Sequence, residues 1–253
     1  MKLEELVHNT LYSVADLNSQ IPDVDQMAEH LCLELGLGDI EKFKIKFIEH
    51  LSDSEILKTC FYPGVIDELQ QLIASLEENS KSILIASWTQ GNLFLQSQKA
   101  SIFQEHIHNK NIGSPSIYAS LEKLDLLSSV VEDFENQGCD LICVIDDRIN
   151  NVLNAHKKLF NAYKNLKFIH KIRPDKSITH KLNLNDKAES WTEQGLIDIT
   201  EWIELEKLLL ESNSKKIGLI LDKDGVIYNT TLYRVLLEKS LIEFLQEEIN
   251  NKY

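Results

Sequence analysis

The chain has 253 residues, 43% of them hydrophobic, and this length fits one α/β domain or a core with a small accessory domain. Its formal net charge of -14, from 26 basic and 40 acidic side chains, disfavours nucleic acid and anionic membrane surfaces as partners. Small anionic substrates would also be repelled unless a bound cation reversed the field locally, so a cluster of carboxylates would favour a metal site.

The four cysteines stand in mostly apolar runs and show no metal-finger spacing; they are Cys32, Cys60, Cys139 and Cys143. We therefore expect free, reduced thiols packed in the interior, which suits the cytoplasm. The chain opens without a positively charged leader, and no apolar run approaches the ~20 residues needed to cross a bilayer. These features predict a soluble cytoplasmic protein.

The first part of the chain is predicted to be helical. Between residues 3 and 51 apolar side chains recur at helical spacing, and Pro63-Gly64 ends this region. A further amphipathic pattern near residues 232–249 predicts a helix close to the end of the chain. We predict that residues 1–60, completed by residues 230–253, form a small α-helical cap.

The remainder alternates between helical patterns and short apolar runs. The apolar runs predict strands at Ile83–Ala86, Ile117–Ala119, Leu141–Ile145, Lys167–Ile172 and Ile217–Leu221. The helical patterns lie near residues 65–76, 121–134, 150–160 and 200–210. Alternation of this kind predicts an α/β fold with a doubly wound parallel sheet, whose core spans residues 61–229.

The strongest functional signal is an apolar strand that ends in Asp222, Lys223, Asp224 and Gly225. Residues two apart in an extended chain return to the same side, so both carboxylates can address one site. Ligands bind at this end of the strands in open α/β sheets, and Gly225 permits an abrupt change of direction. An acidic surface turn or a fragment of a calcium loop would give the same letters, but neither explains the buried-strand pattern before them.

These residues resemble the motifs of the haloacid dehalogenase (HAD) superfamily. The segment 217–230 is similar to the first motif, a hydrophobic strand followed by Asp-x-Asp-Gly and an Asn-Thr pair. The second motif, a strand ending in Ser or Thr, is matched at Ser87. The fourth, a strand ending in paired acids, is matched at Asp146 and Asp147. Taken singly, Ser87 reads as a cap or turn hydroxyl and the acidic pair as a helix start, but their order along the chain favours the motifs.

The third motif is a basic residue, matched best by Lys123 at the start of a predicted helix, with Lys110 as a competitor. Thr89 and Asn92 follow Ser87 closely, and the resemblance implies that they line the phosphate site together with Gly225. The side chain between them and Ser87, Trp88, is interpreted either as facing the substrate or the cap, or as packing in the core.

The motifs stand in an unusual order, because the first motif precedes the cap and the other motifs in the family but comes last here. The resemblance covers nearly the whole chain if its ends are joined. We therefore predict a circular permutation in which the strand at 217–222 completes the core. The rival interpretation is that residues 215–253 begin a second, truncated copy, which predicts a core without its central strand.

A metal follows from the carboxylates themselves. Asp146, Asp147, Asp222 and Asp224 would repel one another strongly at one sheet edge, and all-oxygen ligands suit Mg²⁺. The resemblance implies that Asp222 and Asp147 offer side-chain oxygens and Asp224 its backbone carbonyl. For Asp146 it implies a direct or water-mediated contact.

The resemblance also implies an activity. Asp222 would be the nucleophile that forms an aspartyl phosphate, Asp224 the acid and base, and Ser87 and Lys123 the groups that neutralise the phosphoryl oxygens. The expected enzyme is a HAD-type phosphatase for a small phosphorylated metabolite. A phosphomutase, or a non-catalytic phosphoacceptor or binding protein on the same fold, remains an alternative.

Overall fold

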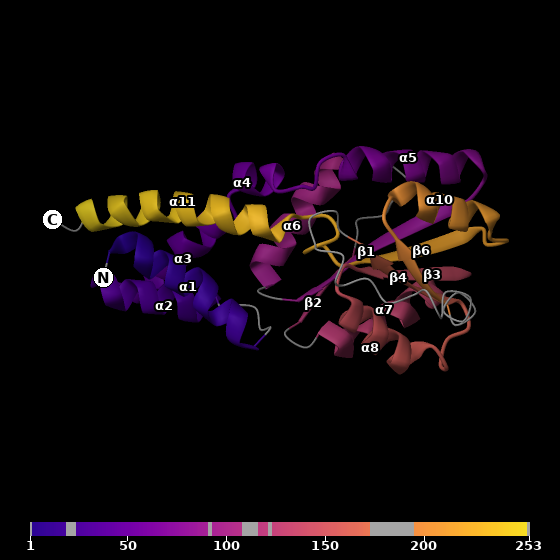
Figure 1. The fold of residues 1–253 in the computed structure, drawn as a ribbon, viewed down its shortest axis with the longest axis horizontal. Helices are drawn as coiled ribbons and strands as arrows, with labels where there is room; N and C mark the ends of the chain where they lie inside the picture. The colour runs from indigo at the N-terminus through magenta and orange to yellow at the C-terminus, as the bar shows by residue number, and fades with distance from the viewer. Residues whose placement is uncertain are drawn as a thin grey trace.

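The computed structural model describes residues 2–18, 24–90, 93–107, 116–120, 123–172 and 195–251. Over these ranges the chain forms an α/β fold, with a parallel sheet covered by helices on both faces and a bundle of helices beside it (Figure 1). The predicted fold class, a doubly wound parallel sheet with a helical accessory region, is therefore confirmed.

The described sheet has six strands, which run in the order β2-β1-β6-β3-β4-β5 and pair in parallel throughout. Their bounds are β1 Ser82–Gln90, β2 Ser116–Ser120, β3 Leu141–Asp146, β4 Leu166–Lys171, β5 Leu196–Ile199 and β6 Lys216–Leu221. Strand β6 comes last in the sequence but lies between β1 and β3. All five predicted strands are present, and β5 was not predicted, because its four residues are too short to give a pattern.

Two pairs of helices cover the sheet. On one face α5 (Val65–Glu78) packs beside α10 (Trp202–Glu211), and on the other α7 (Lys123–Asn136) packs beside α8 (Ile149–Leu159) (Figure 1). A further helix, α6 (Leu93–His106), was not predicted and contacts β1, β2 and α4. It therefore lies between the sheet and the accessory helices.

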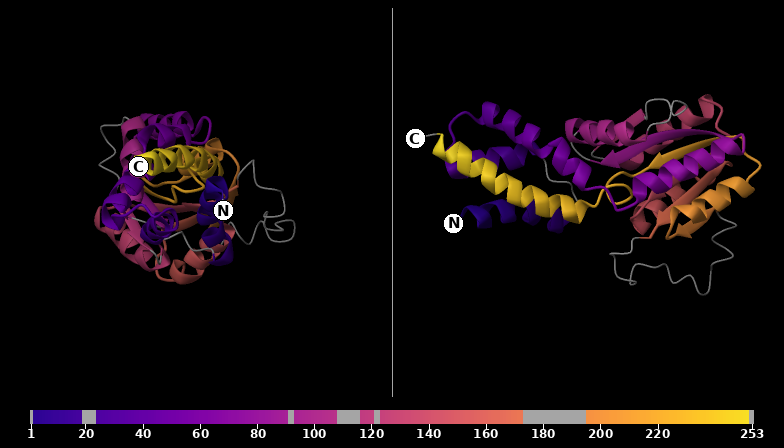
Figure 2. Two further views of the ribbon diagram at one scale, coloured as in Figure 1. Left: turned by 90° about the vertical axis from the view of Figure 1, so that its left-hand side faces the viewer. Right: turned by 90° about the horizontal axis from the view of Figure 1, so that it is seen from above.

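The accessory helices form a bundle, which we call the helical unit. Its members are α1 Leu3–Asn18, α2 Val24–Leu35, α3 Ile40–Leu51, α4 Ser54–Thr59 and α11 Thr230–Asn250. Helix α11 packs against α1 and α4, so segments from both ends of the sequence lie side by side (Figure 2). Asn229 begins α11 as its N-cap, because its side-chain oxygen accepts a hydrogen bond from the Leu232 amide at 2.9 Å. No helix in the described ranges is long and apolar enough to cross a membrane.

Two chain segments connect the helical unit to the sheet, and they are hydrogen-bonded to each other. The Tyr62 amide donates to the Ile227 carbonyl at 3.0 Å, and the Asn229 amide donates to the Cys60 carbonyl at 2.7 Å. Between these bonds Phe61 forms an antiparallel bridge with Tyr228. The polar backbone groups of the connection are thus satisfied where the chain crosses between the two parts.

A glycine in the central strand lets α7 pack closely on the sheet. A Cβ atom at Gly218 would lie 2.3 Å from Cδ1 and 2.9 Å from Cε1 of Phe134, a buried residue of α7. Contacts this short do not occur in packed interiors, so the ring occupies the space that a side chain at residue 218 would need.

We predict that Gly218→Ala lowers the free energy of unfolding by about 1–3 kcal/mol, since the Phe134 ring must move to admit the methyl group. Urea denaturation followed by circular dichroism measures the change. Combining Gly218→Ala with Phe134→Leu should cost less than the sum of the single changes, because the smaller side chain leaves room. A Gly218→Ala protein as stable as the unchanged chain would contradict this packing.

Candidate functional site

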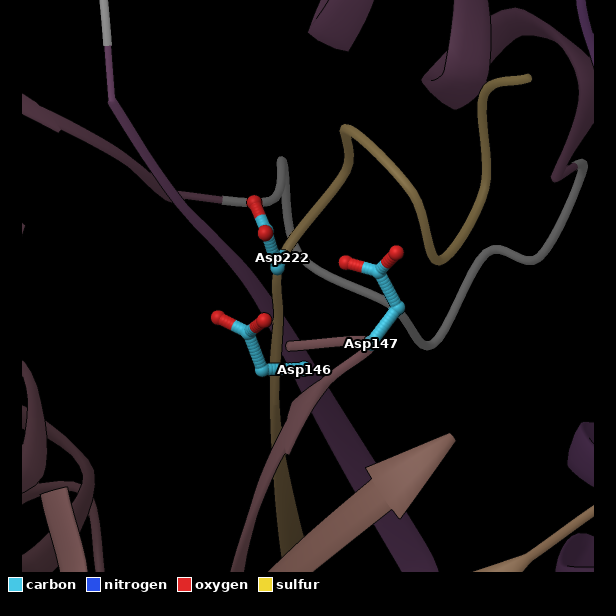
Figure 3. A group of neighbouring side chains, drawn as sticks. All are labelled: Asp146, Asp147 and Asp222. Carbon is cyan, nitrogen blue, oxygen red and sulfur yellow. The ribbon is translucent and has the colours of Figure 1, made fainter. Parts of the chain in front are cut away.

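Three buried carboxylates meet at the carboxyl end of the central strands. Leu221 of β6 is in register with Ile145 of β3, so Asp222 and Asp146 leave their strands at the same level. Asp147 follows directly, and the three side chains each offer an oxygen within 4.8 Å of the others (Figure 3). Their exposed fractions are 0% for Asp146, 6% for Asp147 and 5% for Asp222. The prediction that the carboxylates at these two strand ends lie close together is confirmed for Asp146, Asp147 and Asp222.

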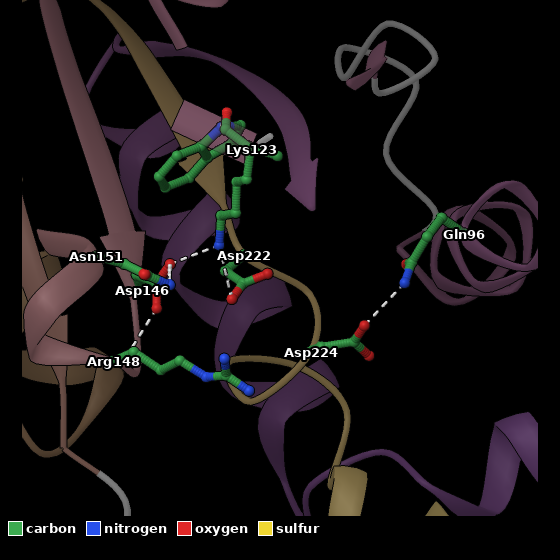
Figure 4. Close-up of polar contacts among 8 residues, drawn as sticks. Gln96, Lys123, Asp146, Arg148, Asn151, Asp222 and Asp224 are labelled. Atoms are coloured by element: carbon green, nitrogen blue, oxygen red, sulfur yellow. Dashed lines mark hydrogen bonds and ion pairs between the residues drawn. The ribbon is translucent and has the colours of Figure 1, made fainter. Parts of the chain in front are cut away.

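Lys123 joins two of these carboxylates. Its Nζ lies 2.5 Å from Asp146 Oδ2 and 2.8 Å from Asp222 Oδ2, and the side chain is buried (Figure 4). Burial by itself lowers the pKa of this ammonium group, but the two carboxylates outweigh that effect and the net direction is upward. Lys123 is therefore held as a cation at the centre of the site. The competing candidate, Lys110, lies outside the described residues.

Trp88 contacts this lysine through both its indole N–H and its ring. Its indole Nε1 donates to the Lys123 carbonyl at 2.7 Å, and the Lys123 ammonium lies 4.1 Å from the centre of the ring. The side chain is fully buried, which agrees with the packing interpretation of Trp88. The contact fixes the start of α7 against β1, and a cation over an indole ring is electrostatically favourable.

Asp146 is anchored on its other side by α8. Its Oδ1 accepts a hydrogen bond from the Arg148 amide at 2.8 Å, and its Oδ2 accepts one from Asn151 Nδ2 at 3.0 Å. Together with Lys123, the carboxylate therefore has three donors (Figure 4). Two of these donors, Arg148 and Asn151, stand at the start of α8. Asp146 is thus positioned rigidly, and negative charge is favoured at that end of a helix.

The Asp224 carboxylate does not join the cluster. The chain leaves the extended conformation directly after Asp222, because the Lys223 carbonyl accepts hydrogen bonds from the amides of Ile227 and Tyr228. Asp224 is nevertheless near enough to raise the pKa of Asp222 by charge repulsion, a smaller contribution than that of burial. The expectation that both carboxylates address one site therefore stays a prediction.

Asp224 instead turns towards α6. Its Oδ2 accepts a hydrogen bond from Gln96 Nε2 at 2.8 Å (Figure 4). Its Oδ1 lies 2.6 Å from Lys99 Nζ. Burial by itself raises the pKa of this carboxyl, but Lys99 and Gln96 outweigh burial and the net direction is downward. In this arrangement Asp224 is ionised and bound to α6.

Gly225 is required by Asp147. Its φ of +93° is unfavourable for other residues, and a Cβ atom there would lie 2.3 Å from Asp147 Oδ1 and 2.4 Å from its Cγ. The Asp147 carboxylate therefore occupies the space that a side chain at residue 225 would fill. Gly225, predicted to lie at the phosphate site, shapes the acidic cluster directly.

The remaining predicted residues stand on β1 beside the cluster. Ser87 is in register with Leu221, and Ser87 and Thr89 are 1% and 0% exposed. Neither hydroxyl has a hydrogen-bond partner within the described part of the chain. Buried hydroxyl groups without partners are uncommon and indicate a place where a ligand or water binds. Asn92 lies outside the described residues.

The cluster can hold a cation. Three carboxylates and the single ammonium group of Lys123 leave an excess of two negative charges in a buried space. Burial raises the pKa of Asp222 well above its usual range, and the nearby carboxylates Asp146 and Asp147 raise it further while Lys123 partly offsets them. A divalent cation that prefers oxygen ligands would neutralise this excess. The expected metal site therefore fits Asp146, Asp147 and Asp222, without the Asp224 side chain.

Four residues around the site were not predicted from the sequence. Arg148 and Asn151 hold Asp146, and Gln96 and Lys99 hold Asp224. Asn151 falls within a predicted helix directly after the acidic pair, and from this position its contact with Asp146 could have been predicted. Gln96 and Lys99 belong to the unpredicted helix α6 and had no such signal.

We predict that Asp222→Asn stabilises the metal-free protein at neutral pH. The folded-state pKa of Asp222 is raised above its unfolded value near 4. As pH rises from the unfolded pKa to the folded one, ionisation of Asp222 therefore lowers the free energy of unfolding. The variant should therefore gain on the order of 1 kcal/mol at pH 7 and little at pH 4. Urea denaturation in a chelator at both pH values measures this difference.

Asp146→Asn is the matched comparison. Its carboxylate accepts three hydrogen bonds, so the same change should destabilise the protein at pH 7. Equal effects of the two substitutions would contradict the distinct environments described for Asp222 and Asp146.

We predict that Gly225→Ala removes most of the stabilisation that Mg²⁺ gives, because the new methyl group displaces the Asp147 carboxylate. The measurement is the melting temperature with and without millimolar Mg²⁺. Gly64→Ala is the control, since residue 64 has a similar φ of +77° but its nearest neighbour is Glu68 Oε1 at 3.6 Å. The control should lose stability through strain yet keep the response to Mg²⁺; an undiminished response in Gly225→Ala would refute the assignment of Asp147.

Comparison with family models, with curated proteins and with solved structures finds no match for this chain. The relationship to the HAD superfamily therefore remains a prediction from the motifs around Asp222, Ser87, Lys123 and Asp146. What the chain does has to be inferred from the chemistry of these residues and from their positions in the fold.

Proposed function

We propose that the protein is a Mg²⁺-dependent phosphatase of the HAD type, which acts on a small phosphorylated metabolite through an aspartyl phosphate on Asp222. The observation that supports this most directly is the position of Lys123, whose ammonium contacts Asp222 and Asp146 together. A nucleophilic carboxylate beside a fixed cation, at the carboxyl end of a central strand, suits phosphoryl transfer. Such transfer depends mainly on positioning and on neutralising charge.

In the first step an Asp222 oxygen attacks phosphorus and the bond to the leaving oxygen breaks. The nucleophile is presented by the end of β6, where the Asp222 amide is tied to the Ile145 carbonyl at 2.9 Å. Lys123 neutralises charge on the transferring oxygens. The hydroxyl of Ser87, which has no partner among the described residues, can donate to one of them. The product of this step is a carboxyl phosphate on the protein and a free alcohol.

Asp224 is the acid and base in this proposal. It donates a proton to the leaving oxygen in the first step and accepts one from the water that hydrolyses the carboxyl phosphate in the second. Both oxygens of Asp224 are bound to Gln96 and Lys99, so the carboxylate must first leave α6 and take up a proton. Catalysis therefore requires a movement of this side chain.

The metal proposed for the site is Mg²⁺, and Asp146, Asp147 and Asp222 are the residues that would hold it. A bound Mg²⁺ would supply positive charge that polarises the phosphoryl group and offsets the repulsion among the carboxylates. The excess of two negative charges within the cluster supports a divalent rather than a monovalent ion.

We also propose that the helical unit acts as the cap and that the core is circularly permuted. The position of β6 between β1 and β3 supports this proposal, because the rival interpretation of a truncated second copy predicts a core without its central strand. The helical unit joins the sheet directly beside the site, at Cys60–Tyr62 and at Ile227–Asn229. Residues of the unit could therefore contact a substrate bound at Asp222.

A second candidate function is a phosphoacceptor module. The contacts of Asp224 with Gln96 and Lys99 favour it, because a carboxylate whose two oxygens are bound to other side chains is not free to activate water against the carboxyl phosphate. Such a protein would accept a phosphoryl group from a small donor and keep it. A phosphomutase would instead return it to a second hydroxyl group of the substrate.

We predict that Asp222→Asn lowers the hydrolysis of p-nitrophenyl phosphate in Mg²⁺ by about 10³-fold or more, since the nucleophile is lost while the fold is retained. Asp224→Asn should release a burst of about one nitrophenol per protein and then turn over roughly 10²-fold more slowly than the unchanged chain, because the amide cannot activate water. Stopped-flow absorbance measures both.

Asp140→Asn is the control, because this carboxylate binds the amides of Lys215 and Lys216 at the opposite end of β6. It should retain the activity of the unchanged chain. Turnover that persists in Asp222→Asn would exclude the proposed nucleophile. A lasting phosphoprotein without turnover in the unchanged chain would establish the phosphoacceptor instead.

A further inference from the structure

Lys99 is a buried cation that the proposed reaction does not use. It lies on α6 with its side chain 5% exposed, and its Nζ contacts Asp224 Oδ1 at 2.6 Å. The rings of Tyr228 and Tyr233 lie beside this ammonium, with their centres 5.7 and 5.0 Å away. The surroundings therefore hold Lys99 at a fixed position beside the loop that follows Asp222.

A second buried lysine stands close to it. Lys223 is 0% exposed, and its Nζ donates to the Gln96 carbonyl at 2.6 Å. Burial lowers the pKa of Lys223 to about 7, and the nearby Lys99 lowers it too, while Asp224 and Asp222 partly offset these effects. At neutral pH Lys223 therefore carries only part of a positive charge, and Lys99 is the ammonium group that binds Asp224 directly.

As the proposed acid and base, Asp224 has to exchange protons with groups bound at Asp222, but in the position described both of its oxygens are bound, one to Lys99 and one to Gln96. Its departure would leave the Lys99 ammonium buried without an anion, which is strongly unfavourable. An anion from outside the chain that replaced the Asp224 carboxylate at Lys99 would remove this cost.

We propose that Lys99 binds a carboxylate of the substrate, so that the substrates are phosphorylated carboxylic acids whose carboxylate takes the place of Asp224 on α6. This inference rests on the proposed function and names its substrate class. A carboxylate is the group expected because the position already holds one, with donors from Lys99 and Gln96 that match its two oxygens. The exchange releases Asp224 only when such a substrate is bound.

The position is open to a ligand from the solvent side and lies near the helical unit. The Asp224 side chain is 23% exposed, so a substrate carboxylate could reach the place it occupies. Tyr233 belongs to α11, and its hydroxyl donates to the Leu51 carbonyl at 2.8 Å. The helical unit therefore borders the proposed carboxylate position, and in a chain with a net charge of -14 the Lys99 ammonium supplies local positive charge for a doubly anionic substrate.

The test compares three non-hydrolysable probes in excess Mg²⁺: methylphosphonate, phosphonoacetate and 3-phosphonopropionate. Calorimetric titration of the full chain should show that at least one carboxylate-bearing probe binds about tenfold or more tightly than methylphosphonate, as expected for a charge-assisted contact. Lys99→Met should abolish this preference and change the affinity for methylphosphonate by less than about threefold. Lys99→Arg keeps the cation and should retain part of the preference.

A second variant separates binding from a structural role of Lys99. Asp224→Asn keeps Lys99 but removes its competing carboxylate, so the affinity for phosphonoacetate or 3-phosphonopropionate should rise while that for methylphosphonate stays the same. This measurement decides the matter even if Lys99→Met does not fold. A purely structural Lys99 would not produce a selective gain.

The outcomes for the two proposals differ. If none of the three probes binds in Mg²⁺, the phosphoryl site itself is absent and the proposed function fails. If all three bind equally in the unchanged chain and in Asp224→Asn, the phosphoryl site stands but the carboxylate position at Lys99 is overturned.

Discussion

The ion pairs of Lys123 are the interactions on which the rest of the site depends. One buried ammonium has to neutralise Asp146 and Asp222 together, which requires β3 and β6 to be neighbours and α7 to begin directly over their ends. A buried Lys123 ammonium without any carboxylate beside it would be strongly unfavourable, so these elements are held in mutual register. Even with Lys123, the three carboxylates keep an excess of two negative charges. The fold thereby creates a place for a cation beside them.

Most of the sheet and the acidic part of the site could be predicted from the sequence. The buried strands are short apolar runs bounded by polar residues, as expected for a parallel sheet covered on both faces. The carboxylates Asp222, Asp146 and Asp147 follow two of these runs, and the carboxyl ends of neighbouring parallel strands share one edge. Their meeting is therefore a consequence of the strand pattern. Lys123 was selected as the best match to the third motif of the resembled family, at the start of a predicted helix.

What the sequence did not reveal is the second half of the site, which lies on α6. A helix is recognised by an apolar stripe, but the buried side of α6 includes Gln96 and Lys99, at 3% and 4% exposure. These two buried polar residues interrupt the apolar stripe of α6, and this stripe is the pattern by which a helix is predicted. The contacts of Asp224 with α6 were also not predicted, because they depend on a helix that no apolar stripe indicated.

The late position of β6 in the chain also has a physical explanation. A strand in a parallel ladder is bound by its neighbours, β1 and β3, and these hydrogen bonds do not depend on which segment precedes it. The connections to the helical unit do not depend on chain order either, because the segments that contain Cys60 and Asn229 are hydrogen-bonded to each other side by side. The loop after β6 therefore contacts α6, the acidic cluster and α11 at once. Tyr233 of the helical unit lies beside the Lys99 ammonium, and Lys99 in turn binds Asp224. The helical unit is thus linked by these contacts to the side chain that must move if the proposed reaction occurs.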